Sequence, residues 1–122
     1  MEGVILFGHG SRDPQWRRPM DAVASRLAQR EPELAVRCAF LELMQPDLPS
    51  AAAELARLGL RKVRIVPLFL GVGRHVREDL PRLVELLAAA HPAVAWALQP
   101  AVGEEPRLLD LLADLALGNG SA

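Results

Sequence analysis

Short apolar runs alternate with longer segments of helical periodicity along this chain of 122 residues. Compact apolar runs of the kind that form buried strands cover residues 4–7, 34–40, 62–68 and 93–98. Between and after them, apolar residues recur at helical spacing within residues 14–30, 48–58, 76–90 and 105–117. The pattern therefore predicts four strands, each followed by a helix.

Strands that alternate with helices predict an α/β fold with a parallel sheet and right-handed crossovers. The first and third apolar runs are continuous, as expected for strands that are covered on both faces. We expect a four-stranded parallel sheet of flavodoxin-like order 2-1-3-4 with flanking helices. Residues 1–117 should form one domain, and residues 118–122 a flexible C-terminal tail.

Composition and charge narrow the classes of function. The 14 basic and 15 acidic side chains give a net charge of -1, which argues against nucleic-acid binding. No apolar stretch approaches the roughly 20 residues of a membrane helix. The start of the chain lacks the basic segment and cleavage site of a signal peptide. We therefore expect a cytoplasmic protein, in which the single cysteine, Cys38, is a small buried core residue.

Two of the three histidines fall in the two loops where chemistry is expected. In an open α/β sheet, ligands bind beyond the carboxyl ends of the strands where the strand order reverses. For order 2-1-3-4 this point lies between the first and third strands, whose following loops contain His9 and His75. Imidazole is a common ligand of divalent metals and a proton acceptor near neutral pH. We predict that His9 and His75 form one metal site, and that His91 lies at the opposite rim.

Other polar residues near these loops are open to a functional or a structural interpretation. Glu42 follows the second strand and either assists His9 or is a solvated loop residue. Asp79 either orients His75 or pairs with Arg82 on a helix face. Candidates for binding an anionic substrate, which are equally consistent with ordinary surface residues, are Ser11, Arg12, Arg74 and Arg77.

The motifs resemble those of the sirohydrochlorin chelatases of the cobaltochelatase type. The residues that carry the resemblance are 7–14 (FGHGSRDP), 40–42 (FLE) with Pro46, 67–75 (PLFLGVGRH) and 79–81 (DLP). The resemblance extends from the first strand to about residue 100, and it is with the short, single-domain members, which are homodimeric. It implies a class II chelatase fold and insertion of a divalent metal into sirohydrochlorin, on the way to cobalamin or sirohaem.

The resemblance implies that His9 and His75 bind the metal and assist removal of the pyrrole protons. It also implies that Glu42 occupies the position of an acidic residue that assists them. The metal is a substrate: cobalt on the resemblance, with ferrous iron or nickel as alternatives of suitable ligand chemistry. No phosphate-binding loop of the Walker type and no organic cofactor motif is visible, so we expect an ATP-independent reaction.

Two other functions compete with the chelatase. A metal or tetrapyrrole carrier would use the same histidines without turnover. A phosphoryl-transfer enzyme could use His9 as its nucleophile. The residue before His9 is Gly8, however, where a histidine phosphatase has the arginine that binds the phosphate, and this disfavours the phosphatase.

Overall fold

The computed structural model describes residues 1–118. Their strands and helices, in chain order, are β1 (Glu2–Gly8), α1 (Arg18–Arg30), β2 (Ala35–Phe40), α2 (Leu48–Arg57), β3 (Lys62–Pro67), α3 (Arg74–Ala90), β4 (Ala95–Leu98) and α4 (Pro106–Leu117). Single turns of 3-10 helix, η1 (Pro14–Arg17) and η2 (Val102–Glu104), precede α1 and α4. Among residues 1–118, no helix is both long enough and apolar enough to cross a membrane. The expected tail lies almost entirely outside the described residues.

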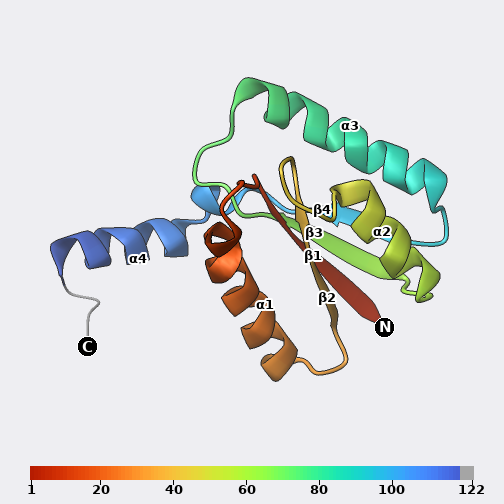
Figure 1. Cartoon of the computed structure of the whole chain (residues 1–122), viewed down its shortest axis with the longest axis horizontal. Coiled ribbons are helices and arrows are strands. Elements are labelled where there is room, and N and C mark those ends of the chain that lie inside the picture. The colour runs from red at the N-terminus through yellow and green to blue at the C-terminus, as the bar shows by residue number, and fades with distance from the viewer. Residues whose placement is uncertain (119–122) are drawn as a thin grey trace.

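All four strands are parallel, in the order β2-β1-β3-β4. This confirms the predicted sheet and its strand order. Figure 1 shows α2 and α3 on one side of the sheet and α1 on the other. The carboxyl ends of β1, β2 and β3 therefore share one rim, with β1 between its two neighbours.

Successive side chains of a strand point to opposite faces of the sheet, and this divides the hydrophobic core into two clusters. On β1, Ile5 and Phe7 belong to the larger cluster, which also contains α2 and α3 residues. Val4 and Leu6 belong to a smaller cluster with Met20 of α1. Side chains two residues apart in a strand lie on the same face, so β1 needs apolar residues at successive positions. This explains the unbroken apolar run that predicted it.

Two predicted helix starts differ from the structure. The segment expected to be one helix from residue 14 begins as η1, because the Asp13 carboxylate accepts a hydrogen bond from Gln15 N (2.9 Å) and caps this separate turn. In the other direction, α3 begins at Arg74, two residues earlier than expected. His75 therefore lies in the first turn of a helix and not in a loop, which corrects the predicted placement.

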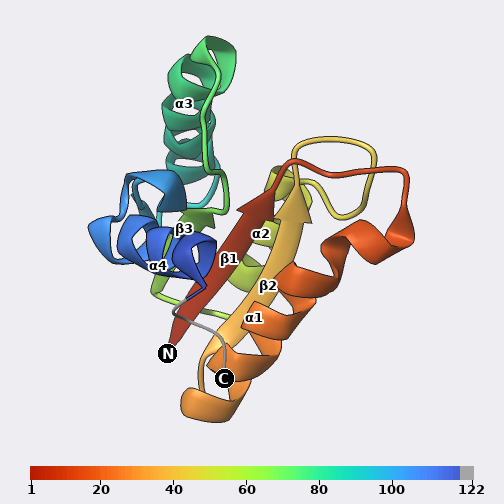
Figure 2. The same cartoon turned by 90° about the vertical axis from the view of Figure 1, so that its left-hand side faces the viewer.

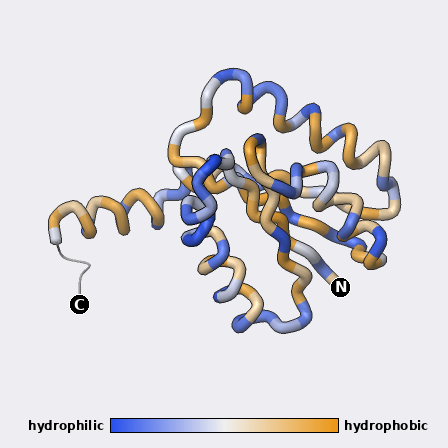
Figure 3. The backbone as a smooth tube through the Cα atoms, viewed as in Figure 1, coloured by the Kyte–Doolittle hydropathy of each residue, from blue (hydrophilic) through white to orange (hydrophobic). Residues whose placement is uncertain are grey.

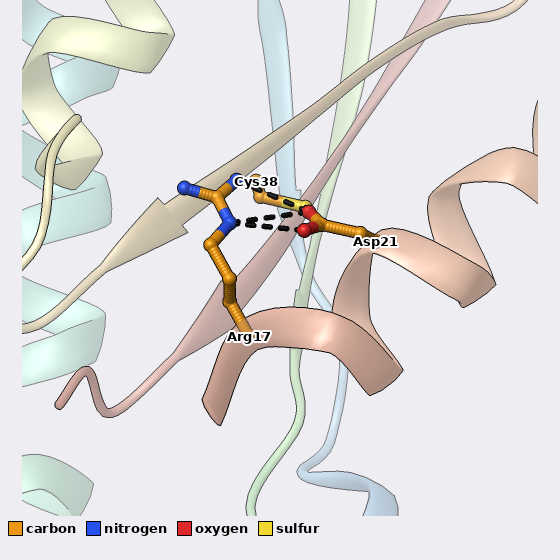
Figure 4. Close-up of polar contacts among 3 residues, drawn as sticks. All are labelled: Arg17, Asp21 and Cys38. Atoms are coloured by element: carbon orange, nitrogen blue, oxygen red, sulfur yellow. Dashed lines mark hydrogen bonds and ion pairs between the residues drawn. The ribbon is translucent and has the colours of Figure 1, made fainter. Parts of the chain in front are cut away.

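Cys38 packs against the smaller core cluster, as expected, but it is only partly buried. It lies on β2 beside the Arg17–Asp21 ion pair, with its Sγ 4.0 Å from Asp21 Oδ1 (Figure 4). Burial, followed by the nearby Asp21 charge, raises the pKa of the Cys38 thiol. Cys38 thus lies at the boundary between this core cluster and an exposed ion pair.

The last helix, α4, packs differently from the others. None of its residues is buried, although it is rich in leucine. Figure 3 shows it mostly in the hydrophobic colour, and Figure 1 shows it extending away from the sheet. It ends at Gly118, which adopts the left-handed conformation (φ 82°) typical of a helix C-terminus.

Candidate functional site

The loops after β1 and β2 are joined by backbone hydrogen bonds that continue the strand pairing past the end of the sheet. Leu41 N donates to Gly8 O (2.9 Å), and Glu42 N donates to His9 O (3.1 Å). Figure 2 shows these two loops side by side above the strand ends. The pairing places the side chains of His9 and Glu42, which are 33 positions apart in the sequence, next to each other.

Gly10 makes this close approach possible. Its φ of 101° lies in the left-handed region, which favours glycine. A Cβ built at this position would overlap the carbonyl oxygen of Glu42. The glycine that follows His9 therefore fixes the distance between the two loops.

His9 and Glu42 form the central contact of the site. Nε2 of His9 lies 3.1 Å from Oε1 of Glu42, and 56% and 55% of the two side chains are exposed. An ionised carboxylate only accepts hydrogen bonds, so in this contact the Nε2–H of His9 donates to Glu42. The pair is accessible from solvent. This favours the functional interpretation of Glu42 over that of a solvated loop residue.

Phe69, which sequence reasoning quoted in a motif but gave no role, supports His9 from the loop after β3. It is 8% exposed, and its ring centroid lies 6.4 Å from that of His9 at an interplanar angle of 75°. Phe69 also meets Phe7 of β1 edge-to-face at 5.7 Å. A signal was present in the sequence: a large aromatic residue directly after a buried strand, at the same rim as His9.

His75 faces a pocket at the same rim. This pocket has a volume of about 490 Å³, within the range of small-molecule sites. Its lining combines residues at the carboxyl ends of β1 and β2 with residues of α3: Phe7, Leu41, His75, Val76, Asp79, Leu80, Arg82, Leu83 and Leu86. Phe7 and Leu41 are two residues and one residue away from His9 and Glu42, so the pocket adjoins the His9–Glu42 pair.

The structure places His9 and His75 at one rim, but not in contact with each other. Among residues 1–118, no three His, Cys, Asp or Glu side chains converge closely enough to hold a metal ion. Within the same residues, neither a His75–Asp79 hydrogen bond nor an Asp79–Arg82 ion pair is present. The metal site shared by the two histidines therefore stays a prediction. For Asp79, the structure supports neither the orientation of His75 nor the pairing with Arg82.

The predicted anion-binding residues are spread around the rim. Ser11 Oγ accepts a hydrogen bond from Asp13 N (3.0 Å), while Arg12 is exposed on the same loop. Arg74 pairs with Glu78 on α3 (3.2 Å). Arg77 lines a separate cavity of about 150 Å³ between α3 and the segment after β4. The structure thus does not gather these four residues into one pocket.

His91 lies far from this rim, as predicted. It is the C-terminal capping residue of α3, where its N donates to Leu87 O (2.9 Å). Its ring contacts Trp96 at 5.9 Å between centroids. These contacts are structural.

A family model described as CbiX matches residues 3–117. A sirohydrochlorin cobaltochelatase of Methanosarcina acetivorans is 34% identical over 84 residues, which are 69% of this chain and 65% of that protein. The chain thus spans less than two thirds of the length of this relative.

Solved structures have the same fold. The crystal structure of a CbiX protein of Marinobacter aquaeolei VT8, assigned to cobalamin (vitamin B12) biosynthesis, matches with a TM-score of 0.82 and 31% identity, over 97% of this chain and 96% of that one. SirB from Bacillus subtilis with Fe3+ matches with a TM-score of 0.77 and 20% identity, over 99% of this chain and 48% of that one.

Proposed function

This chain belongs to the CbiX family, and we propose that it catalyses insertion of a divalent metal ion into sirohydrochlorin without ATP. The observation that carries the proposal is the exposed His9–Glu42 pair at 3.1 Å, beside the pocket that His75 lines. Metallation joins M²⁺ to the macrocycle and releases two pyrrole protons. The site must therefore accept protons, present the metal and hold the tetrapyrrole.

The His9–Glu42 pair meets the first requirement. We assign His9 the role of proton acceptor for a pyrrole N–H, once the tetrapyrrole is bound. In this role His9 uses a ring nitrogen that is free of a proton, and Glu42 stabilises the imidazolium that forms. Both side chains are more than half exposed, so protons can pass from this pair to solvent.

His9 and His75 together are proposed to present the metal. His9 would use its ring nitrogen that does not contact Glu42, and this nitrogen would accept a pyrrole proton only after the ion has left it. Few protein ligands at an open site keep the ion exchangeable, whereas a closed cage of four ligands would hold it. Cobalt is the proposed ion, because curated relatives are named as cobaltochelatases. Ferrous iron and nickel, whose ligand preferences also include imidazole and carboxylate, are the alternatives.

The pocket and the surrounding cations meet the third requirement, which is to hold the tetrapyrrole. The apolar side chains of Leu41, Leu83 and Leu86 offer a surface for the face of a macrocycle. The carboxylates at the edge of the substrate would bind cationic and hydroxyl side chains around the rim. The candidates are Ser11, Arg12, Arg74 and Arg77. We further propose that the active form is a homodimer.

Turnover with sirohydrochlorin tests the function directly. The wild-type protein is mixed with sirohydrochlorin and Co²⁺, or with Fe²⁺ in the absence of oxygen, and metallation is followed by absorbance. Many product molecules per protein molecule are expected. A single stoichiometric uptake would instead identify a carrier, and a rate equal to the uncatalysed one with Co²⁺, Fe²⁺ and Ni²⁺ would exclude the chelatase.

Variants test the residue roles. His9→Ala and His75→Ala are each expected to abolish metallation while the far-UV circular dichroism stays unchanged, because both residues lie at the rim. Glu42→Gln keeps the shape of the side chain but removes its charge, so the rate should fall and its pH dependence should change. His91→Ala is the matched control and should metallate at the wild-type rate. Unfolding of either rim variant would make that histidine structural.

A further inference from the structure

Leu43, in the loop after β2, has an unusual backbone conformation. Among residues 1–118, it alone of the non-glycine residues has a positive φ, of 65°. Glycine adopts this left-handed region freely and asparagine or aspartate with little difficulty, whereas a bulkier side chain is strained there. Any of those three residues would fold more easily at this position. The presence of a leucine therefore points to a use of its side chain.

A three-residue turn holds Leu43 in this conformation. Met44 N donates a hydrogen bond to Glu42 O (2.8 Å), and with a φ of 65° at the middle residue this is the rare, strained form of the γ-turn. Both neighbours of Leu43 are fixed, because Glu42 N donates to His9 O (3.1 Å) and Met44 packs against the smaller core cluster. The surrounding structure thus imposes the strain on Leu43.

The fold gains little from the side chain of Leu43. The residue is 54% exposed, and neither core cluster of residues 1–118 includes it. Burial of apolar surface therefore does not offset the strain in the backbone. Strained conformations that the surrounding structure maintains in this way cluster at sites of function.

Exposed leucines gather at the rim that carries the His9–Glu42 pair (Figure 2). Outside α4, residues 1–118 have eight exposed large apolar side chains, and four of them belong to this rim: Leu41, Leu43, Leu70 and Leu86. Two of the four line the pocket that His75 faces. Another directly follows Phe69, whose ring contacts His9. Apolar side chains around a few polar groups are typical of a site for a ligand with a large apolar face.

We propose that Leu43 contacts the substrate, and that its side chain packs on the apolar face of the metal-free tetrapyrrole beside the His9–Glu42 pair. This inference rests on the function proposed above. A tetrapyrrole that gives a pyrrole proton to His9 lies against this pair, and Leu43 directly follows Glu42 in the chain. The strained turn keeps the leucine at the rim, since Met44 takes the place in the core. Covering the exposed part of one leucine strengthens binding by roughly 5- to 10-fold.

Two substitutions separate the side chain of Leu43 from its backbone. Leu43→Ala and Leu43→Gly both remove the side chain, but only glycine relieves the strain of the positive φ. Leu43→Gly should therefore unfold at a higher Tm than Leu43→Ala, which reverses the usual order of glycine and alanine. Both variants should bind metal-free sirohydrochlorin roughly 5- to 10-fold more weakly than the wild type, as measured by fluorescence anisotropy of the tetrapyrrole. Leu43→Met, which keeps a long apolar side chain, should bind it as the wild type does.

Initial rates of metallation distinguish a substrate contact from an effect on the neighbouring Glu42. A lost contact should raise KM by the same factor as the affinity falls and leave kcat unchanged. Leu58, which is 52% exposed after α2 and has a negative φ (−75°), is the matched control. Leu58→Ala and Leu58→Gly should keep the wild-type affinity and KM, and there the glycine variant should be the less stable of the two.

Three results would overturn the contact of Leu43 with the tetrapyrrole. They are wild-type affinity in both Leu43→Ala and Leu43→Gly, an affinity that follows the Tm of the variants, and a fall in kcat at unchanged affinity. A failure of the proposed function looks different. If the wild type binds metal-free sirohydrochlorin with the expected dependence on Leu43 but gives no turnover, metal insertion is excluded and the contact stands. A wild type that does not bind sirohydrochlorin would overturn both.

Discussion

Replacing Gly10 by alanine should separate the two side chains of the proposed catalytic pair, His9 and Glu42. An ordinary carbon–oxygen contact is about 3.3 Å, and the Cβ of an alanine would overlap Glu42 O, so the loops must move apart by more than about 1 Å. The His9–Glu42 contact of 3.1 Å is then too long for a hydrogen bond. Metallation should therefore fall strongly in Gly10→Ala, even though no reacting side chain has been changed.

The energetic cost has two parts. Holding an alanine at a φ of 101° costs roughly 1–2 kcal/mol. Weakening the hydrogen bonds from Leu41 N and Glu42 N adds about 1 kcal/mol each. The sum of about 3–4 kcal/mol corresponds to a fall in Tm of roughly 12–16 °C for a domain of this size.

The variant Gly59→Ala measures the cost of holding an alanine at a positive φ, separately from the overlap with a neighbouring loop. Gly59 also has a positive φ (78°), but a Cβ there meets nothing within 4 Å. The effect of alanine on the unfolded chain is the same in both variants, so it cancels in the comparison. Gly59→Ala should lose about 1 kcal/mol and metallate at the wild-type rate. Thermal unfolding by circular dichroism and initial rates measured well below both Tm values provide the comparison. Equal losses of Tm, with a wild-type rate in Gly10→Ala, would refute the reasoning.

Three further variants test other parts of the structure. Asp47 caps α2 by accepting a hydrogen bond from Ser50 N (2.8 Å), and hydrogen bonding to the side chain and then to the backbone of Ser50 lowers the pKa of Asp47. Asp47→Ala should therefore lose about 1 kcal/mol of stability at neutral pH. Urea unfolding should show this difference shrinking as the pH falls through the pKa of Asp47, since a protonated carboxyl no longer stabilises the cap. Because burial, followed by the charge of Asp21, raises the pKa of Cys38, its alkylation at pH 8 should be slower than that of an unfolded control, and Asp21→Asn should accelerate it. An unchanged alkylation rate in Asp21→Asn would contradict the contribution assigned to the Asp21 charge. Phe69→Leu should cost about 1 kcal/mol through its lost ring contacts and slow metallation more than it alters the fold, which paired Tm and rate measurements will show.

The sheet could be predicted because its strands are simple in sequence. A parallel strand covered on both faces needs an unbroken apolar run, and Val4 to Phe7 are all at most 3% exposed. The alternation of strands and helices predicted a parallel sheet, and the flavodoxin-like order expected for such a sheet placed the loops after β1 and β3 side by side. The rim of the sheet at which the candidate site lies could thus be predicted from the sequence.

Helix starts were less predictable, for a local reason. Gly71 and Gly73 gave the segment before His75 the composition of a loop, yet Gly73 is the N-terminal capping residue of α3 and the helix begins one residue later. Glycine is compatible with both a loop and a helix cap, so the composition could not distinguish them. Asp13 likewise creates η1 by capping, a contact that apolar periodicity does not record.

The partnership of Glu42 with His9 depends on strand register, which the sequence did not provide. Gly8 pairs with Phe40, and the pairing continues through hydrogen bonds from Leu41 and Glu42 to the loop after β1. A shift of one residue would turn Glu42 away from His9, since side chains alternate between faces. The spacing of these residues alone therefore left Glu42 with two interpretations, and the register favours one of them.

The separation of His75 from the His9–Glu42 pair has a consequence for the proposed reaction. His9 and Glu42 are held by backbone pairing with the sheet, whereas His75 is carried by α3 on the other side of an open pocket. On the proposed function, a ligand set divided in this way would bind an ion weakly until the substrate fills the space between its parts. On the proposed function, the tetrapyrrole would complete the site, and the ion would pass to the macrocycle because the protein alone offers it no closed cage.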